Sequence, residues 1–146
     1  MITLELEYPY AGKTTKDTAK FLRELATPKL HHLTLAYCDF DDDCAEVLGS
    51  CPGLGNLTRL VLDQATLSTK AAKKLLRSPN LQRLVELCIE PRDGEAETAF
   101  GKAVELLLDP TIMPLLARGW FSTTGVAEVT IERLQEARPG VVISQW

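Results

Sequence analysis

Apolar residues recur along this chain with a period of 27 positions. The same comb occurs twice, first as Leu30, Leu33, Leu35, Cys38 and Phe40 and then as Leu57, Leu60, Leu62, Ala65 and Leu67. A fixed period of this length is typical of architectures in which similar units stack on one another. The two large residues that stand two positions apart in each comb predict a short strand with one buried face.

The frame extends over the whole chain when it is continued by 27 positions in both directions. Its two doublet positions fall on Leu6 and Tyr8, Leu33 and Leu35, Leu60 and Leu62, Leu87 and Ile89, Pro114 and Leu116, and Val141 and Ile143. Eleven of these twelve residues are large and apolar, although only 45% of the chain is hydrophobic. The exception is Pro114, which cannot donate a ladder hydrogen bond, so we expect a short or irregular fifth strand at residues 115–117.

This pattern predicts strands that alternate with helices. We expect strands at residues 2–8, 32–36, 59–63, 86–90, 115–117 and 141–144, and helices at residues 15–26, 69–77, 95–108 and 122–137, with one more carrying Ala45, Val47 and Leu48. Three acidic residues, 41–43, suit the positive end of that second helix. Thr14, Ser68 and Ser122 are the expected N-caps of the first, third and last helices.

The comb resembles that of leucine-rich repeat proteins of the helix-containing, ribonuclease-inhibitor-like type. The matching residues are Leu30-x-x-Leu33-x-Leu35-x-x-Cys38-x-Phe40 and Leu57-x-x-Leu60-x-Leu62-x-x-Ala65-x-Leu67, and Leu81-x-x-Leu84-x-x-Leu87-x-Ile89 continues the series. The resemblance implies an α/β solenoid of about five to six repeats, with a short curved parallel sheet on its concave side and helices on its convex side. It implies one domain over residues 1–146, with an N-terminal capping repeat (1–29), regular repeats (30–108) and divergent C-terminal repeats with a cap (109–146).

Composition narrows the range of partners. A net charge of −4 and a pI near 5.2 argue against a general affinity for nucleic acid or for anionic membranes. No apolar run approaches the ~18 residues that a membrane span needs, and the amino terminus shows no signal-peptide pattern, so we expect a cytoplasmic protein. The four cysteines lack the spacing of a metal site and the density of a disulfide scaffold, so we expect free thiols, no metal and no cofactor.

An enzymatic alternative comes from Gly12-Lys13-Thr14, which lies between a predicted strand and a predicted helix. Such a tripeptide occurs in phosphate-binding loops, and Asp63 would then bind magnesium in a nucleotide-binding enzyme. The loop also needs a glycine five positions before Gly12, where this chain has Glu7, whose carboxylate would repel phosphate. His31 and His32 are the only histidines, and no local signature marks a nucleophile for them. We therefore favour a protein that is not an enzyme.

The outward positions of the predicted strands are the favoured binding surface. The candidate residues are Glu7, His32, Thr34, Arg59, Val61, Asp63, Glu86, Cys88 and Glu90. They form an acid-weighted strip with a small apolar centre that also includes Ala36. Solenoids commonly bind partners on their extended concave surface, and a basic or mixed-charge protein surface would complement this strip. We predict a non-catalytic protein-interaction module whose protein partner is not identified by the sequence.

A second candidate surface consists of the aromatic residues Trp120, Phe121 and Trp146. We expect them to cap the open end of the stack, where a solenoid would otherwise expose its core. Exposed, they would instead form a contact surface for another domain or a second copy of the chain. In that alternative the chain self-associates, or is a structural block of a larger assembly, through the Trp120/Trp146 end.

Overall fold

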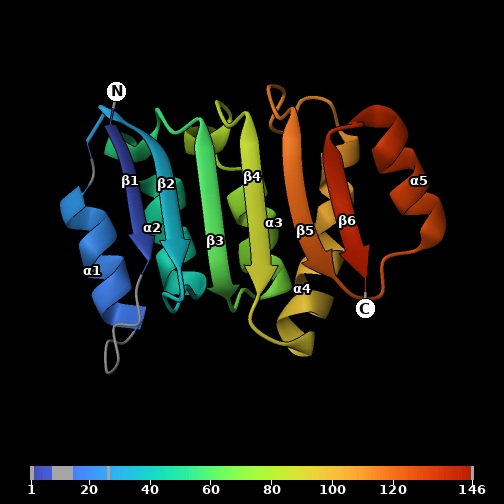
Figure 1. Cartoon of the computed structure of the whole chain (residues 1–146), viewed down its shortest axis with the longest axis horizontal. Coiled ribbons are helices and arrows are strands. Elements are labelled where there is room, and N and C mark those ends of the chain that lie inside the picture. The colour runs from blue at the N-terminus through green and yellow to red at the C-terminus, as the bar shows by residue number, and fades with distance from the viewer. Residues whose placement is uncertain (1, 8–14, 26, 146) are drawn as a thin grey trace.

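Six strands form one parallel sheet in the computed structural model, which describes residues 2–7, 15–25 and 27–145. The strands are β1 (Ile2–Glu7), β2 (Leu30–Ala36), β3 (Arg59–Ala65), β4 (Glu86–Pro91), β5 (Arg118–Thr123) and β6 (Val141–Gln145). They lie side by side in chain order, so each strand pairs only with its sequence neighbours (Figure 1). The predicted α/β class with a parallel sheet is confirmed.

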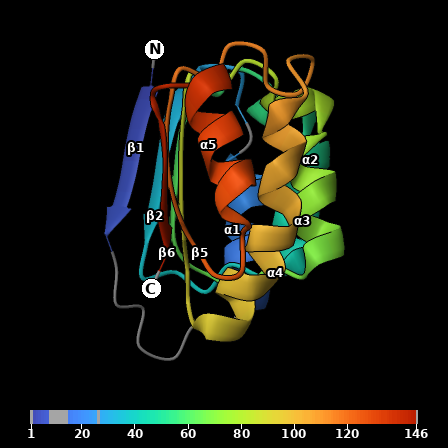
Figure 2. The ribbon, with the colours of Figure 1, turned by 90° about the vertical axis from the view of Figure 1, so that its right-hand side faces the viewer.

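Helices connect the strands and cover one face of the sheet. They are α1 (Thr15–Leu25), α2 (Asp42–Ser50), α3 (Thr69–Leu76), α4 (Gly94–Val104) and α5 (Glu128–Ala137), with short 3-10 segments η1 (Pro52–Leu54), η2 (Pro79–Leu81) and η3 (Glu105–Leu108). All of these helices lie on the same side of the sheet (Figure 2). In the part of the chain that the structure describes, the opposite face carries no helix, and we call it the open face.

The 27-residue period is the pairing register of the central strands. Leu33 pairs with Leu60 and Leu60 with Leu87, while Leu35 pairs with Leu62 and Leu62 with Ile89. All six side chains are at most 1% exposed and belong to the core between sheet and helices. Fully burying one such side chain contributes roughly 1.5–3 kcal/mol. The repeated leucines therefore both stabilise the sheet and align its strands.

The helices of the central units begin at side-chain caps. Asp41 accepts a hydrogen bond from the Cys44 backbone N–H, Ser68 from that of Ala71, and Asp93 from that of Ala96. Each cap satisfies one of the unpaired amides of a helix N-terminus. The predicted start of α3 after Ser68 is confirmed, as is the start of α2 at the acidic residues 41–43.

The predicted fifth strand at residues 115–117 is wrong. The strand is β5, and Leu87 pairs with Gly119, which in turn pairs with Val141. The spacings are therefore 32 and 22 residues in place of 27. Pro114 is unsuited to a strand, so the chain continues through turns as far as Ala117 and begins to pair only at Arg118. The first spacing is five residues longer than 27 and the second is five residues shorter, so Val141 returns to the original frame.

The predicted N-cap at Ser122 is also wrong. Ser122 lies within β5, and α5 begins at Glu128 after Ala127, which provides no side-chain cap. The displacement of the fifth strand explains this error, because the strand occupies the positions where the 27-residue frame places the start of the helix. The predicted end of the helix at Ala137 and the last strand from Val141 agree with the structure.

One buried arginine holds the irregular segment between η3 and β5. The Arg138 side chain follows α5, is only 9% exposed, and donates hydrogen bonds to four backbone carbonyl oxygens. These belong to Leu107 at 2.7 Å, Met113 at 2.8 Å, Asp109 at 3.2 Å and Ile112 at 2.6 Å. Burial lowers the pKa of the guanidinium, and the negative charge of Asp109 opposes that effect.

Candidate partner-binding face

The open face is formed by the strand residues that alternate with the buried doublets. His32, Thr34, Arg59, Val61, Asp63, Glu86 and Cys88 are partly exposed there, and Glu90 is exposed. The backbone of Glu7 lies in β1, in register with Ala36, while its side chain is outside the described part of the structure. Alternation along the strands therefore brings the predicted surface residues together on one face.

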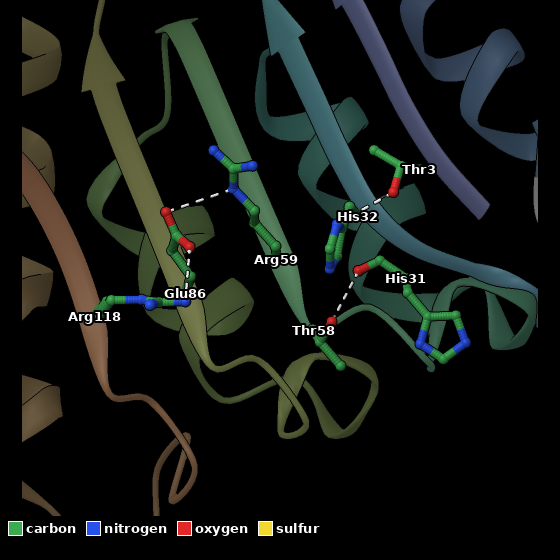
Figure 3. Close-up of polar contacts among 7 residues, drawn as sticks. All are labelled: Thr3, His31, His32, Thr58, Arg59, Glu86 and Arg118. Atoms are coloured by element: carbon green, nitrogen blue, oxygen red, sulfur yellow. Dashed lines mark hydrogen bonds and ion pairs between the residues drawn. The ribbon is translucent and has the colours of Figure 1, made fainter. Parts of the chain in front are cut away.

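A row of polar residues crosses the open face, one from each of the first five strands. This polar row consists, in register, of Thr3, His32, Arg59, Glu86 and Arg118. Thr3 Oγ1 lies 3.2 Å from His32 Nδ1, while one Glu86 carboxylate oxygen is 3.5 Å from Arg59 and the other 3.4 Å from Arg118 (Figure 3). Glu86 thus lies between two guanidinium groups. Partly exposed pairs of this kind contribute about 0–1 kcal/mol each, so their main effect is to orient the side chains.

A second row, two residues farther along β2 to β5 and continuing into β6, is mostly apolar. This apolar row consists, in register, of Thr34, Val61, Cys88, Trp120 and Val142. Val142 is 51% exposed and the other four are partly exposed. The sheet therefore presents a continuous apolar band from β3 to β6 beside the polar row, and no helix of the described chain covers it.

The structure corrects the expected position of the aromatic residues. Trp120 lies in β5, between β4 and β6, so it belongs to the open face and does not cap an end of the sheet. Phe121 points to the opposite side, is completely buried, and packs against Phe100 with ring centroids 5.5 Å apart. Trp146 lies outside the described residues. Consecutive strand residues face opposite sides, which separates Trp120 from Phe121.

Beyond the apolar row lies an acidic pair, Asp63 and Glu90, which are in register on β3 and β4. The Asp63 carboxylate accepts a hydrogen bond of 3.4 Å from the neighbouring Gln64 side chain. Within residues 2–7, 15–25 and 27–145, neither carboxylate forms an ion pair, whereas nearby Asp39 is paired with Arg92 at 3.0 Å. The acidic pair is therefore a local concentration of negative charge at one border of the open face.

The cysteines near this face are free thiols and poor nucleophiles. Burial raises the pKa of Cys88; the Trp120 backbone N–H and Arg59 lower it, and Glu86 adds to the rise. Burial, followed by the negative charges of Asp39 and Asp63, raises the pKa of Cys38. Both thiols are consequently protonated at neutral pH, and Cys88 contributes apolar surface. Over the described ranges, no group of three or more His, Cys, Asp or Glu residues could hold a metal ion.

The residues of the nucleotide-binding alternative are only partly described. Lys13 and Thr14 lie outside the described residues, so their relation to Asp63 is undefined. Asp63 itself is in register with Glu90 on the open face. Glu90 therefore places a second carboxylate beside the residue that this alternative assigns to magnesium.

The sequence prediction omitted four residues of the two rows, namely Thr3, Arg118, Trp120 and Val142. Arg118 and Trp120 were missed because the 27-residue frame placed the fifth strand too early, and Thr3 and Val142 because the candidate residues included only Glu7 from the two outer strands. A local signal was present, since residues 118–123 combine β-branched and aromatic types after a segment broken by two prolines. The apolar row is therefore longer than the small apolar centre that the sequence indicated.

Comparison with known proteins adds no functional information. No protein-family model matches the chain, and a search of curated proteins finds no significant match. Among the described residues, no helix is both long enough and apolar enough to cross a membrane. Function must therefore be inferred from the residues of this chain.

Proposed function

We propose that this chain is a leucine-rich-repeat module of the ribonuclease-inhibitor-like type that binds a protein partner on the open face of its sheet. The chain-order sheet, the helices on one side and the agreement between the 27-residue period and the register of β2 to β4 support this assignment. In stacked repeats each unit buries its apolar side against the next, and the extended sheet face stays available for binding.

The observation that carries the proposal is the uncovered apolar row with charged groups on both of its borders. Protein interfaces commonly have an apolar centre and a polar rim, with tryptophan and arginine among the residues that contribute most to affinity. Trp120 supplies such an aromatic group, Arg118 precedes it by two residues on β5, and Arg59 lies on the same face two strands away. Contiguous exposed apolar surface on a monomer commonly marks a binding site.

We propose that the module is not an enzyme and works without a cofactor in the cytoplasm. The raised pKa of the Cys88 thiol argues against nucleophilic chemistry on the open face. Four free cysteines suit a reducing compartment.

A pull-down from the native extract, read out by quantitative mass spectrometry, tests the proposal. The face variant carries Val61→Lys and Val142→Lys, which place two charges in the apolar row. The matched control carries Val129→Lys and Gln135→Lys, which add the same charge at exposed positions of α5. Both variants leave the buried doublets unchanged, and equal melting temperatures would verify that both are folded.

A protein retained by the wild type and the α5 control but lost by the face variant would support binding on the open face. A protein retained equally by all three chains would place the interface elsewhere and contradict the proposal. The same data separate the alternative in which a second copy binds, because the captured protein would then be this chain itself.

A further inference from the structure

We infer that the partner segment carries a lysine or arginine two positions from a large apolar side chain, and that the cation binds between Asp63 and Glu90 while the apolar group packs on the apolar row. This inference rests on the proposed function and specifies the chemistry of the partner. It follows from the distribution of compensated and uncompensated charge over the open face.

The charged groups of the polar row, and Asp39 and Arg92 near the strand ends, already have an ion-pair partner within the chain. Arg59 and Arg118 share the Glu86 carboxylate in the polar row. At the other border, Arg92 neutralises Asp39. A partner that presents charge to these groups has to displace an existing ion-pair partner, whereas a cation at the acidic pair displaces none.

The acidic pair differs from these groups because no cation of the described chain is paired with it. Asp63 and Glu90 are in register on adjacent strands, and like charges placed directly opposite each other are unfavourable. A cation bound between the two carboxylates would remove this repulsion. Electrostatic complementarity of this kind mainly determines which partner is accepted and how fast it associates.

The acidic pair lies two residues farther along β3 and β4 than the apolar row, which sets the distance between the cation and the apolar side chain of the partner. Asp63 follows Val61 by two strand residues, and Glu90 follows Cys88 in the same way. Two strand residues span roughly 7 Å, which is also the distance between side chains i and i+2 of an extended segment. An extended partner segment with an apolar residue and a lysine or arginine two positions apart would therefore fit both features at once.

A second copy of this chain is a poor occupant by the same reasoning. Each copy has a net charge of −4 and carries the same acidic pair, so two open faces would bring four uncompensated carboxylates toward each other. In each copy the two guanidinium groups that could offset this repulsion share the single Glu86 carboxylate, which leaves one positive charge in excess against the two carboxylates of the acidic pair. Charge complementarity favours a basic partner.

A library of random seven-residue peptides displayed on phage, selected on the immobilised wild-type chain, provides a defined probe. We expect enriched peptides to carry lysine or arginine two positions from a large apolar residue. One enriched peptide, made synthetically, is then titrated by fluorescence polarisation against wild type, Asp63→Asn with Glu90→Gln, and a control with Glu132→Gln and Glu136→Gln. The control removes the same two charges from exposed positions of α5.

The inference predicts that neutralising the acidic pair weakens binding by about tenfold or more, while the α5 control stays within about twofold. Enriched peptides without basic residues that nevertheless lose binding to the Val61→Lys, Val142→Lys variant would overturn the inference and leave the proposed function standing. Peptides that bind all variants equally would contradict both the inference and the proposed function. Failure to enrich any peptide would also overturn the inference, because short basic-apolar segments are what it predicts to bind.

Discussion

Strands β2 to β4 recur every 27 residues, whereas β5 and β6 follow at spacings of 32 and 22 residues. In the central part, aligned leucines set the register and side-chain caps start α2, α3 and α4. In the C-terminal part, Gly119 stands where the leucine doublet would begin, and α5 starts without a side-chain cap. The sheet nevertheless continues through both parts without a break.

Strand pairing thus tolerates connections of unequal length when the additional residues are anchored. The five additional residues before β5 lie in the segment whose carbonyl groups bind Arg138. One cation thus satisfies backbone groups that in a regular unit would belong to a helix or turn. Three experiments test what stabilises the C-terminal part, where the leucine comb is absent. They address Arg138, the start of α5, and Asp109.

The largest expected effect comes from removing the anchor. Arg138→Ala should lower the free energy of unfolding by about 4 kcal/mol, because four backbone carbonyl groups, two of them in buried hydrogen bonds, lose a charged donor. Arg138→Lys should recover only part of this loss, since an ammonium group cannot reach all four oxygens in the planar arrangement of a guanidinium. Urea unfolding followed by circular dichroism measures both.

Arg133→Ala is the matched control, because Arg133 lies on the exposed side of α5. It should change the free energy of unfolding by no more than about 0.5 kcal/mol. Equal losses in Arg133→Ala and Arg138→Ala would show that the buried guanidinium does not hold the C-terminal part.

A smaller effect is expected from giving α5 the cap that the central helices have. Ala127 has the extended backbone of an N-cap residue but no side chain that can accept a hydrogen bond. Ala127→Asp should raise the free energy of unfolding by about 1 kcal/mol, and Ser68→Ala at the start of α3 should lower it by a similar amount. Thermal unfolding of the two variants measures both changes, and an unchanged melting temperature for Ala127→Asp would contradict the prediction.

The smallest expected effect is a dependence of stability on pH in the acidic range. Hydrogen bonds from the Thr111 hydroxyl and backbone N–H, with the charges of Arg138 and Arg77, lower the pKa of Asp109 below its usual 3.8. The unfolded chain therefore binds this proton at higher pH than the folded chain, so the stabilisation is complete above about pH 4 and is lost as the pH falls through the lowered pKa. The stability difference between wild type and Asp109→Asn should shrink as the pH falls below about 4. A difference independent of pH would exclude this contribution.

Much of the central fold follows from side-chain type. The leucine doublets predict β2, β3 and β4 to within about two residues of the observed limits, and Ser68 predicts the start of α3. The fifth strand was not predictable in this way, because Leu116 satisfies the period by coincidence. The contacts of Arg138 were equally hidden, since its partners are backbone carbonyl groups, which every residue has.

The candidate face was predictable only as far as the strands were. Alternation from the buried doublets is enough to assign Arg59, Val61 and Glu86 to the open side of the sheet. Trp120 lies next to Cys88 because of the register between β4 and β5. The 27-residue period does not reveal this register, because β5 begins five residues later than the period predicts. Whether a charge is paired also depends on side-chain positions, which a residue pattern does not specify.

The order of strands along the sheet has a consequence for how the protein reaches its folded state. Because every strand pairs with its sequence neighbours, each pairing closes a loop of about one repeat, and none has to close a loop that spans the chain. Structure can begin at β3, where leucines are aligned on both sides, and grow outward one strand at a time. Opening should proceed in reverse, so the amide hydrogens of β1 and β6 should exchange with solvent before those of β3.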